Sequence, residues 1–163
     1  MTSKKSSPPK KSGGPEYSKA DDRWRHGNIG RLLNNAVRHF EDRVIELLAD
    51  AGHTETTANH INATRHLDRE GTRLTDMAQR AAVTKQSMSE LVEQLEALKL
   101  VARKVDPLDG RARIVYFTTD GFAWLDAFRD AVKQAEKEMA KNIGADSLRG
   151  VKAALKWYGP PEE

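Results

Sequence analysis

Residues 74–121 constrain the fold of this chain more than any other stretch, because their hydrophobic periodicity changes from helical to extended. Two short helical patterns, separated by a tight junction, come first, and Thr75 is expected to cap the first of them. A short extended segment, a charged turn (DPLDGRAR) and a second extended segment (IVYF) follow. This order predicts a helix-turn-helix followed by a β-hairpin wing. Such a unit can lay one helix in the major groove of DNA and the hairpin beside it.

The second helix of this unit is expected over residues 84–98. Its apolar residues form one stripe that must pack inward: Met88, Leu91, Val92, Leu95 and Leu98. Thr84 is expected to be the N-cap, because its hydroxyl can accept a hydrogen bond from the next turn. Side chains suited to phosphates and base edges crowd the start of the helix: Thr84, Lys85, Gln86, Ser87, Ser89 and Glu90. Taken alone, this helix is equally typical of an ordinary amphipathic helix with a solvated face.

The predicted wing, residues 101–117, strengthens the nucleic-acid interpretation. Between Lys99 and Arg113 there are five basic and two acidic residues, a local net charge of +3. Arginines near a hairpin tip can enter a minor groove, where the negative potential is concentrated. The candidates are Arg103, Arg111 and Arg113. A pairing of Asp109 with one of the last two would stiffen the turn and is compatible with that role.

The run VTKQSMSELVEQLEALKLVARKVDPLDGRARIVYFTTDG resembles the MarR family of winged-helix transcriptional regulators. The resemblance is carried by the order and spacing of Thr84, Leu95 with Leu98, the wing motif of residues 106–111, and the Thr-x-x-Gly start of the next helix at residues 118–121. The family often has glycine where Ala82 stands. An alanine with positive φ would cost about 1 kcal/mol, so Ala82 indicates either a compatible turn or a small change in helix placement.

Apolar stripes also mark helices on both sides of this unit. A long helix is expected over residues 23–51, with Gly52 as its C-cap, and a weaker helix over residues 54–67. We expect this weaker helix to pack thinly; the alternative is that its polar side lines a cavity. After Gly121 a long helix is expected up to Gly144, followed by a last helix that ends before Gly159. The expected fold is therefore mainly α with a small β wing: a winged helix-turn-helix with N- and C-terminal dimerisation helices.

We divide the chain into a disordered basic tail (residues 1–20), a helical dimerisation region (21–53 and 119–158) and a winged helix-turn-helix DNA-binding domain (54–118). The tail has five lysines and one glutamate. Because the whole chain has a net charge of +3, residues 21–163 have a net charge of −1, and the basic charge of this part is local to the wing. The stripes of the terminal helices exceed what so small a domain can cover. This favours a homodimer through Ile29, Leu33, Phe128, Val132, Leu148, Val151 and Leu155. An intramolecular helical core is the alternative.

The composition argues against catalysis. The chain has no cysteine, no nucleotide-binding or nucleophile-elbow motif, and no histidine pair at the spacing of a zinc site, so neither an enzyme nor a metal site is expected. No cofactor is expected, although the family resemblance implies a cleft for a small-molecule effector, which Trp24, His39 and Phe40 could approach. The chain has no apolar run of membrane-spanning length and no signal-peptide core, which predicts a cytoplasmic protein without a membrane partner.

Two functions remain open. The first is a dimeric, sequence-specific regulator, expected to be a ligand-responsive repressor that binds a pseudo-palindromic site in double-stranded DNA through residues 84–98 and 101–117. The second is a winged-helix module that binds protein, or DNA without sequence preference. The second is favoured by Glu90, Glu93 and Glu96, which outnumber Lys85 on the recognition helix.

Overall fold

The computed structural model describes residues 23–159, which divide into two compact units between Val37 and Arg38. The tail predicted for residues 1–20 lies outside the described residues. In the first unit, the single helix expected from residue 23 is broken: α1 (Arg23–Gly27) ends and α2 (Ile29–Asp50) begins on either side of Asn28. The Asn28 amide donates to the Trp24 carbonyl (3.0 Å) and accepts from the backbone N–H of Arg31 (3.0 Å). These are the bonds of a capping side chain, which explains the break.

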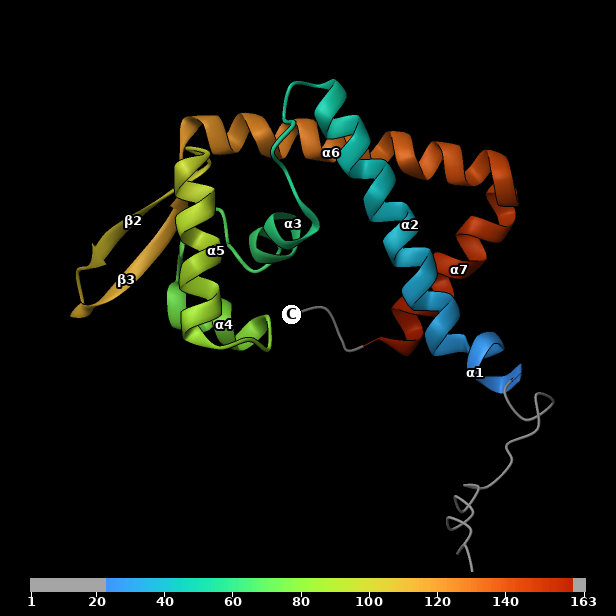
Figure 1. The fold of residues 1–163 in the computed structure, drawn as a ribbon, viewed down its shortest axis with the longest axis horizontal. Helices are drawn as coiled ribbons and strands as arrows, with labels where there is room; N and C mark the ends of the chain where they lie inside the picture. Colours follow the sequence, from blue (N-terminus) through green and yellow to red (C-terminus); the bar gives the residue numbers. More distant parts are fainter. Residues whose placement is uncertain (1–22, 160–163) are drawn as a thin grey trace, which may run out of the picture. The chain divides into compact units, whose positions relative to one another are not determined.

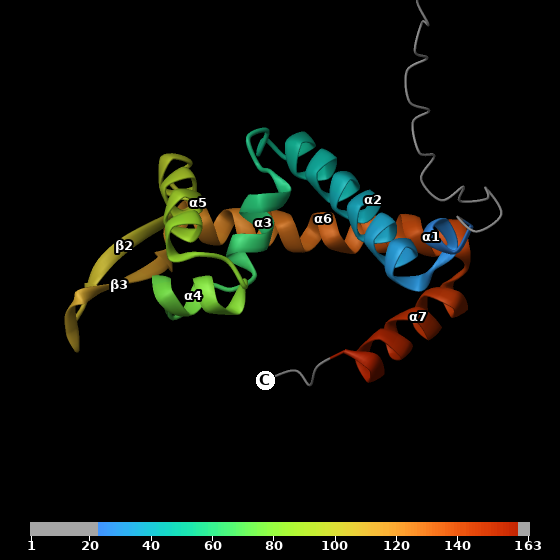
Figure 2. The same ribbon diagram turned by 60° about the horizontal axis from the view of Figure 1, so that its bottom comes forward.

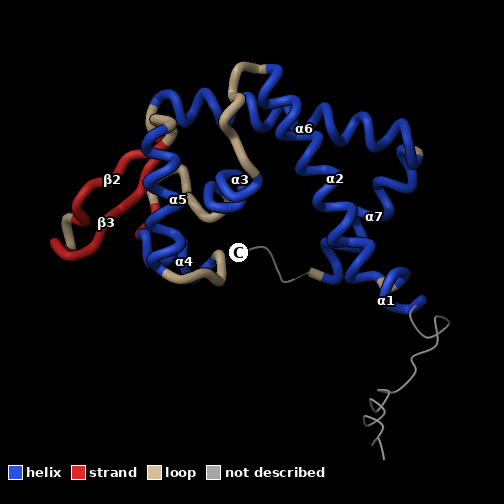
Figure 3. Tube along the Cα trace, viewed as in Figure 1, coloured by secondary structure: helices blue, strands red, loops and turns tan. Residues whose placement is uncertain are grey.

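The second unit contains the end of α2 and all remaining elements: α3 (Ala58–Thr64), β1 (Thr72–Arg73), α4 (Leu74–Arg80), α5 (Lys85–Ala97), β2 (Val101–Asp106), β3 (Asp109–Phe117), α6 (Thr119–Ile143) and α7 (Ala145–Tyr158). Figure 1 shows α4 and α5 next to the β2–β3 hairpin, and Figure 3 shows that the strands of this hairpin are a small part of a helical molecule. The predicted fold class, mainly α with a small β wing, is confirmed.

The three strands form one antiparallel sheet in the order β1-β3-β2. Val101 pairs with Phe117 at the root of the hairpin, and Asp106 pairs with Asp109 at its tip, where the register shifts. β1 adds two residues to the other edge of β3, through Thr72 opposite Val115. The sheet therefore anchors the wing to the segment that begins α4, which limits how far the wing can swing at its root.

The core of the second unit joins helices and sheet. The predicted stripe of α5 packs inward: Met88, Val92 and Leu95 are fully buried, and Leu91 and Leu98 are half-buried against them. The largest fully buried side chain is Trp124 of α6, whose ring stacks on Phe128 at a centroid distance of 5.3 Å. The Trp124 indole N–H donates to the hydroxyl of Thr56 (3.0 Å), so its polar atom is satisfied inside the core.

The C-terminal ends of α2 and α4 are each followed by a residue with a positive φ, Gly52 and Ala82. Gly52 has a φ of +97° and caps α2, as predicted. At the end of α4, Ala82 donates to the Gln79 carbonyl (3.1 Å) and Val83 donates to the Ala78 carbonyl (3.0 Å), which is a Schellman motif. This motif places Ala82 at a φ of +53°. Of the two alternatives for Ala82, the turn with ordinary dihedral angles is therefore wrong, because the motif imposes the left-handed conformation, and the small change in helix placement stays a prediction.

The start of α6 explains the Thr-x-x-Gly motif. Thr118 caps the helix by accepting from the backbone N–H of Gly121 (3.0 Å), and its hydroxyl donates to the Lys99 carbonyl (2.5 Å). A Cβ atom at Gly121 would lie 1.9 Å from the Leu100 carbonyl oxygen. Glycine is required here because the backbone that follows α5 passes directly against the first turn of α6.

Two local predictions for the helix-turn-helix are corrected. Thr75 was expected to cap α4, but the N-cap is Arg73, and the Thr75 hydroxyl lies inside the first turn and donates to Asp76. The helix expected over residues 54–67 is shortened to α3, with Thr57 as its cap. It does not pack thinly, since four of its seven residues are buried. The physical reason is that polar residues of α3 find partners inside the protein: His60 Nε2 lies 3.0 Å from Gln94 Oε1.

Candidate nucleic-acid interface

The first turn of α5 is exposed and is built as the sequence predicted. The Thr84 hydroxyl accepts from the backbone N–H of Ser87 (3.0 Å) and is also bonded to the Ser87 hydroxyl (2.8 Å). Lys85 and Gln86 are exposed beside it. Because α5 is held from behind by its buried stripe, this turn presents a cation, an amide and two hydroxyls on a rigid element.

The outer face of α5 continues from Gln86 to Glu90, one turn later. The Gln86 amide nitrogen donates to the Glu90 carboxylate at 3.3 Å. Both side chains are exposed, so this contact competes with water and leaves either side chain able to bond a base edge. Among residues 23–159, Glu90 has no ion-pair partner, so a carboxylate stands on the face that a nucleic acid would approach.

Ser89 lies on a different face of the same helix. Its hydroxyl donates to Glu93 (3.3 Å) and lies 3.5 Å from an Nη atom of Arg103. Arg103 is also bonded to Glu96, with Nε–Oε1 and Nη2–Oε2 distances of 3.1 Å and 2.6 Å. Ser89, Glu93 and Glu96 thus form a stripe that faces β2 rather than the outer face of α5.

The wing tip is stiffened by Asp106, not by the Asp109–arginine pair that the sequence suggested. The Asp106 carboxylate is buried, accepts from the backbone N–H of Leu108 (2.9 Å) and forms an ion pair with Arg73 (2.6 Å). These two contacts, the Leu108 bond first, lower the pKa of Asp106 below its ordinary value. Asp109 instead accepts from the backbone N–H of Arg111 (3.0 Å).

Arg111 and Arg113 are both exposed on β3 near this tip. The Arg113 guanidinium donates to the carbonyls of Gly110 (3.2 Å) and Ala112 (3.0 Å), so it is folded against the turn. Three elements meet here: a small hollow of about 50 Å³ is lined by Leu74, Thr75, Lys85, Arg111, Ala112 and Arg113. The structure therefore brings the cation that starts α5 together with the two wing arginines, although 26 or more residues separate them along the chain.

The predicted site residues fall into two groups. Six of them form one exposed surface across the start of α5 and the wing: Thr84, Lys85, Gln86, Ser87, Arg111 and Arg113 lie on it, with Glu90 at its edge. Ser89 and Arg103 lie between α5 and β2, where they contact one another. Sequence reasoning did not identify Arg73 and Asp106 as the pair that holds the wing tip, because the two residues are 33 positions apart.

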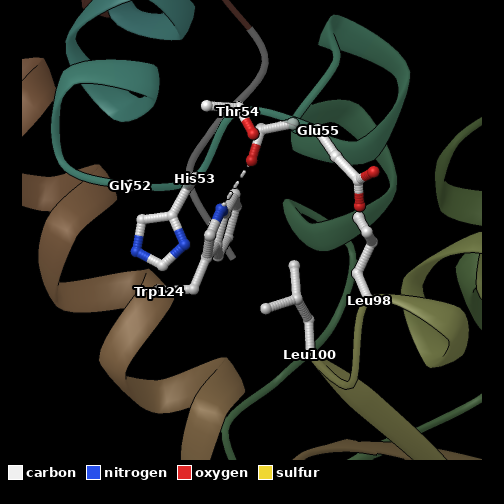
Figure 4. A pocket seen from close by; sticks show the side chains of 8 residues that line it. Gly52, His53, Thr54, Glu55, Leu98, Leu100 and Trp124 are labelled. Atoms are coloured by element: carbon white, nitrogen blue, oxygen red, sulfur yellow. Dashed lines mark hydrogen bonds between the residues drawn. The ribbon is translucent and has the colours of Figure 1, made fainter.

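A pocket of about 200 Å³ lies at the C-terminal end of α5, within the second unit. It is lined by Gly52, His53, Thr54, Glu55, Thr56, Leu98, Leu100 and Trp124. Figure 4 shows the His53 imidazole beside the Trp124 indole, with Leu100 facing into the space below. The pocket thus contacts the loop after α2, the end of α5 and the start of α6. Of the three residues expected near an effector, Trp24 and His39 are exposed, Phe40 packs against the core, and none of them lines this pocket.

The residues predicted to mediate dimerisation differ in how far their own chain covers them. Ile29 is exposed and Leu33 is half-buried; Phe128, Val132 and Leu148 are half-buried; Val151 and Leu155 are exposed. α7 has no buried residue at all, and Trp157 and Tyr158 at its end are 88% and 80% exposed. Figure 2 shows α7 extending from the end of α6. Dimerisation through these particular residues stays a prediction.

Within residues 23–159, no group of three or more histidine and acidic side chains is placed to hold a metal ion. His60 is bonded through one ring nitrogen to Gln94, and its Nδ1 is buried without a partner. In the same part of the chain, no helix is long and apolar enough to cross a membrane.

Comparison with known proteins agrees with this geometry. Residues 54–112, which run from α3 into the wing, match the model of the MarR family. The fold is similar to that of reduced MarR from E. coli (TM-score 0.70, 22% identity, 81% of this chain and 96% of that chain). It is also similar to an E. coli MarR mutant complexed with operator DNA (0.68, 20%, 84% and 97%) and to a MepR–DNA complex from S. aureus (0.63, 20%, 80% and 96%). No curated protein matches the chain. The family resemblance of the recognition helix and wing is confirmed.

Proposed function

We propose that this chain, whose winged-helix segment matches the MarR family and whose fold is that of MarR, is a dimeric, sequence-specific DNA-binding transcriptional regulator. In this proposal α5 enters a major groove with Lys85 and Gln86 foremost, and the wing places Arg111 over the adjacent minor groove. The observation that carries the proposal is the convergence of Lys85, Arg111 and Arg113 around one hollow on an otherwise acidic unit. The DNA complexes of the MarR mutant and MepR, which share the fold, support it.

A dimer follows from the apolar side chains of α7. Val151, Leu155 and Tyr158 are spaced by four and three residues, so they lie on one face of α7, and all three are exposed within the chain. An exposed apolar face of this kind is typical of a protein interface. A two-fold dimer would bury them and present two copies of α5 to the two halves of a pseudo-palindromic operator. Repression then requires only that the bound dimer covers the operator.

The pocket supports control by a small molecule. Its volume is below the ~300–1,000 Å³ of sites for drug-sized ligands, so the effector would be about the size of a single ring. Trp124 and two leucines offer an apolar wall, and His53 and Glu55 offer polar contacts. An occupant would press on Leu98 and Leu100, which directly follow α5. We therefore expect ligand binding to shift α5 and to lower the affinity for DNA.

The test of DNA recognition is a selection of genomic fragments by the purified protein, at low and near-physiological salt, with Arg111→Ala in parallel. A single pseudo-palindromic motif that persists at the higher salt is expected. Arg111→Ala should weaken binding at all sites and lower the salt slope by about 0.9 for each phosphate that is no longer neutralised. The control is Arg129→Ala, since Arg129 is an exposed arginine of α6 that is paired with Asp126. Enrichment without a motif that vanishes as salt rises would contradict sequence-specific recognition.

A second candidate function is favoured by Glu90. This carboxylate lies on the outer face of α5 without an ion-pair partner in the part of the chain that the structure describes, so it would repel a phosphate backbone. A winged-helix module that binds protein, or DNA without sequence preference, would tolerate it. Glu90→Gln separates the two functions. In a regulator that reads cytosine through Glu90, the selected motif changes at one base pair. In a non-specific module, affinity rises equally for all sequences.

The role of the pocket is tested by measuring whether small molecules release the protein from its operator DNA. Small aromatic acids and amines are screened for loss of fluorescence anisotropy of a labelled operator, and hits are repeated with Glu55→Ala and with Glu70→Ala. Glu70 is an exposed residue between α3 and β1, outside the pocket. An effector of this pocket loses potency with the first variant alone. Equal potency on all three proteins would place the effector elsewhere.

A further inference from the structure

Arg103 is held by α5 rather than directed outward. Its guanidinium makes a two-point contact with Glu96, at 3.1 Å and 2.6 Å, and a third polar contact at 3.5 Å with Ser89. The Arg103 and Glu96 side chains are only 27% and 28% exposed. A planar guanidinium that meets a carboxylate at two points fixes direction as well as distance.

Three side chains of α5 contact the Arg103 guanidinium. Ser89, Glu93 and Glu96 are spaced by four and three residues, so they lie on one face of the helix. Glu93 lies 3.8 Å from Arg103 and also accepts from Ser89. Two of the three acidic residues that argue against DNA binding, Glu93 and Glu96, are thus turned toward a wing cation, whereas Glu90 is not. Their charge is partly neutralised within the protein.

The position of Arg103 in the hairpin allows its contact with Glu96 to fix the orientation of the wing. Arg103 is opposite the fully buried Val115, two pairs along the hairpin from the root pair of Val101 and Phe117, whereas Arg111 lies near the tip. Only Leu98, Lys99 and Leu100 connect α5 to β2. The fixed contact between Arg103 and Glu96 therefore sets the angle between α5 and the wing.

Resting on the proposed function, we propose that Arg103 is a positioning residue: bound to Glu96, it sets the angle between α5 and the wing so that both reach their grooves together. Arg103 then makes no contact with DNA, since a phosphate contact would require it to leave both oxygens of Glu96. Glu96, although acidic and on the recognition helix, then strengthens DNA binding.

The decisive variant is Glu96→Gln, because the two possible roles of Arg103 predict opposite changes in the affinity for the operator. If Arg103 is a positioning residue, removal of the ion pair loosens the wing and weakens operator binding about two- to fivefold. If Arg103 binds DNA, Glu96→Gln frees it and removes a negative charge, so operator binding tightens. Binding is measured by anisotropy with the selected operator across a salt series, with Glu70→Gln as the matched control.

Three further variants are measured in the same titration. Arg103→Ala should weaken binding with an unchanged salt slope, whereas Arg111→Ala lowers the slope by about 0.9. Arg103→Ala should add no further weakening in the Glu96→Gln background. Arg103→Lys, which keeps the charge but lacks the two-point geometry, should not restore affinity. A reduced slope in Arg103→Ala, or tighter binding by Glu96→Gln, overturns the proposal.

Amide hydrogen exchange separates this proposal from the proposed function. In the free protein, Glu96→Gln should speed exchange in residues 101–117, and Glu70→Gln should not. If the wild type selects no DNA motif and Arg111→Ala changes nothing, the regulator function fails, but the exchange result still decides whether Arg103 and Glu96 set the wing. Unchanged exchange in Glu96→Gln overturns that role.

Discussion

Ala82 holds a backbone conformation that its side chain disfavours. Its φ of +53° is imposed by the Schellman motif at the end of α4, and a left-handed L-residue costs about 1–2 kcal/mol. Ala82→Gly removes this strain but adds about 0.5–1 kcal/mol of unfolded-state entropy. We expect a net increase of about 0.5–1 kcal/mol in the free energy of unfolding, measured by urea denaturation.

The neighbouring residue provides the control for that substitution. Ala81 has a φ of −78°, an ordinary helical value, so Ala81→Gly relieves no strain and should lower the free energy of unfolding by about 0.5–1 kcal/mol. Ala82→Gly and Ala81→Gly should therefore change the free energy of unfolding in opposite directions. A destabilised Ala82→Gly would mean that the turn before α5 does not adopt a positive φ in solution.

Gln86 is the residue best placed to read a base. It is exposed in the first turn of α5, and its side-chain amide makes a long hydrogen bond of 3.3 Å to Glu90. Gln86→Ala should cost about 1–3 kcal/mol at one base pair of the operator and change the selected motif there. The measurement is a competition between operator variants. Lys85→Ala, by contrast, should weaken all sequences alike. An unaltered motif in Gln86→Ala would assign base recognition to another side chain.

At the scale of elements, α7 is a helix that its own chain does not bury. Leu155 is 44% exposed, so Leu155→Asp removes little packing within the protomer. We expect it to convert the dimer to a folded monomer, observed by sedimentation velocity together with an unchanged far-UV circular dichroism spectrum. Ala153→Asp adds the same charge on the opposite side of the helix and should leave the dimer intact.

Phe128 is a less selective test of the same interface. It was predicted to mediate dimerisation, yet its ring stacks on the fully buried Trp124 and packs against the core. Phe128→Asp would therefore destabilise the protomer as well as any dimer, and the two effects could not be separated by sedimentation alone. A dimer that persists in Leu155→Asp would show that α7 is not part of the dimer interface. The apolar residues of α6 would then be the next candidates for it.

For the molecule as a whole, an ion pair between α2 and α6 predicts sensitivity to acid. Arg43 lies 2.8 Å from Glu138, and this guanidinium, with the Gln134 amide, lowers the pKa of Glu138 from 4.5 to about 2. A depressed carboxyl pKa means that the pair stabilises the folded state fully above pH ~4.5 and that this contribution is lost as pH falls toward 2. The pKa values of Asp68, Asp106 and Asp130 shift in the same direction.

Glu138→Gln isolates the contribution of this pair. The free energy of unfolding, measured by urea at several pH values, should be lower in the variant than in the wild type at about pH 6. The difference should shrink between pH 4.5 and about pH 2, because the wild-type glutamate becomes protonated there. Glu70→Gln is the control and should follow the wild-type curve. A constant difference across this pH range would show that the ion pair is not what Glu138 contributes.

Local chemistry determined much of this fold from the sequence alone. The α5 stripe from Met88 to Leu95, the caps at Thr84 and Thr118, and the C-cap at Gly52 depend on residues within a few positions of one another, so their patterns were visible before any contact was known. The wing was predictable for the same reason, since its turn residues and alternating strands are contiguous.

Contacts between distant residues decided the rest. The bond of Trp124 to Thr56, the pairing of Asp106 with Arg73 and the pocket beside His53 all depend on how separate elements meet. The same reason applies to Arg103. The sequence marks it as a cation of the wing, and only the packing of α5 against β2 shows that Glu96 binds it. Side-chain chemistry is local, whereas the partner that defines its role is chosen by the tertiary structure.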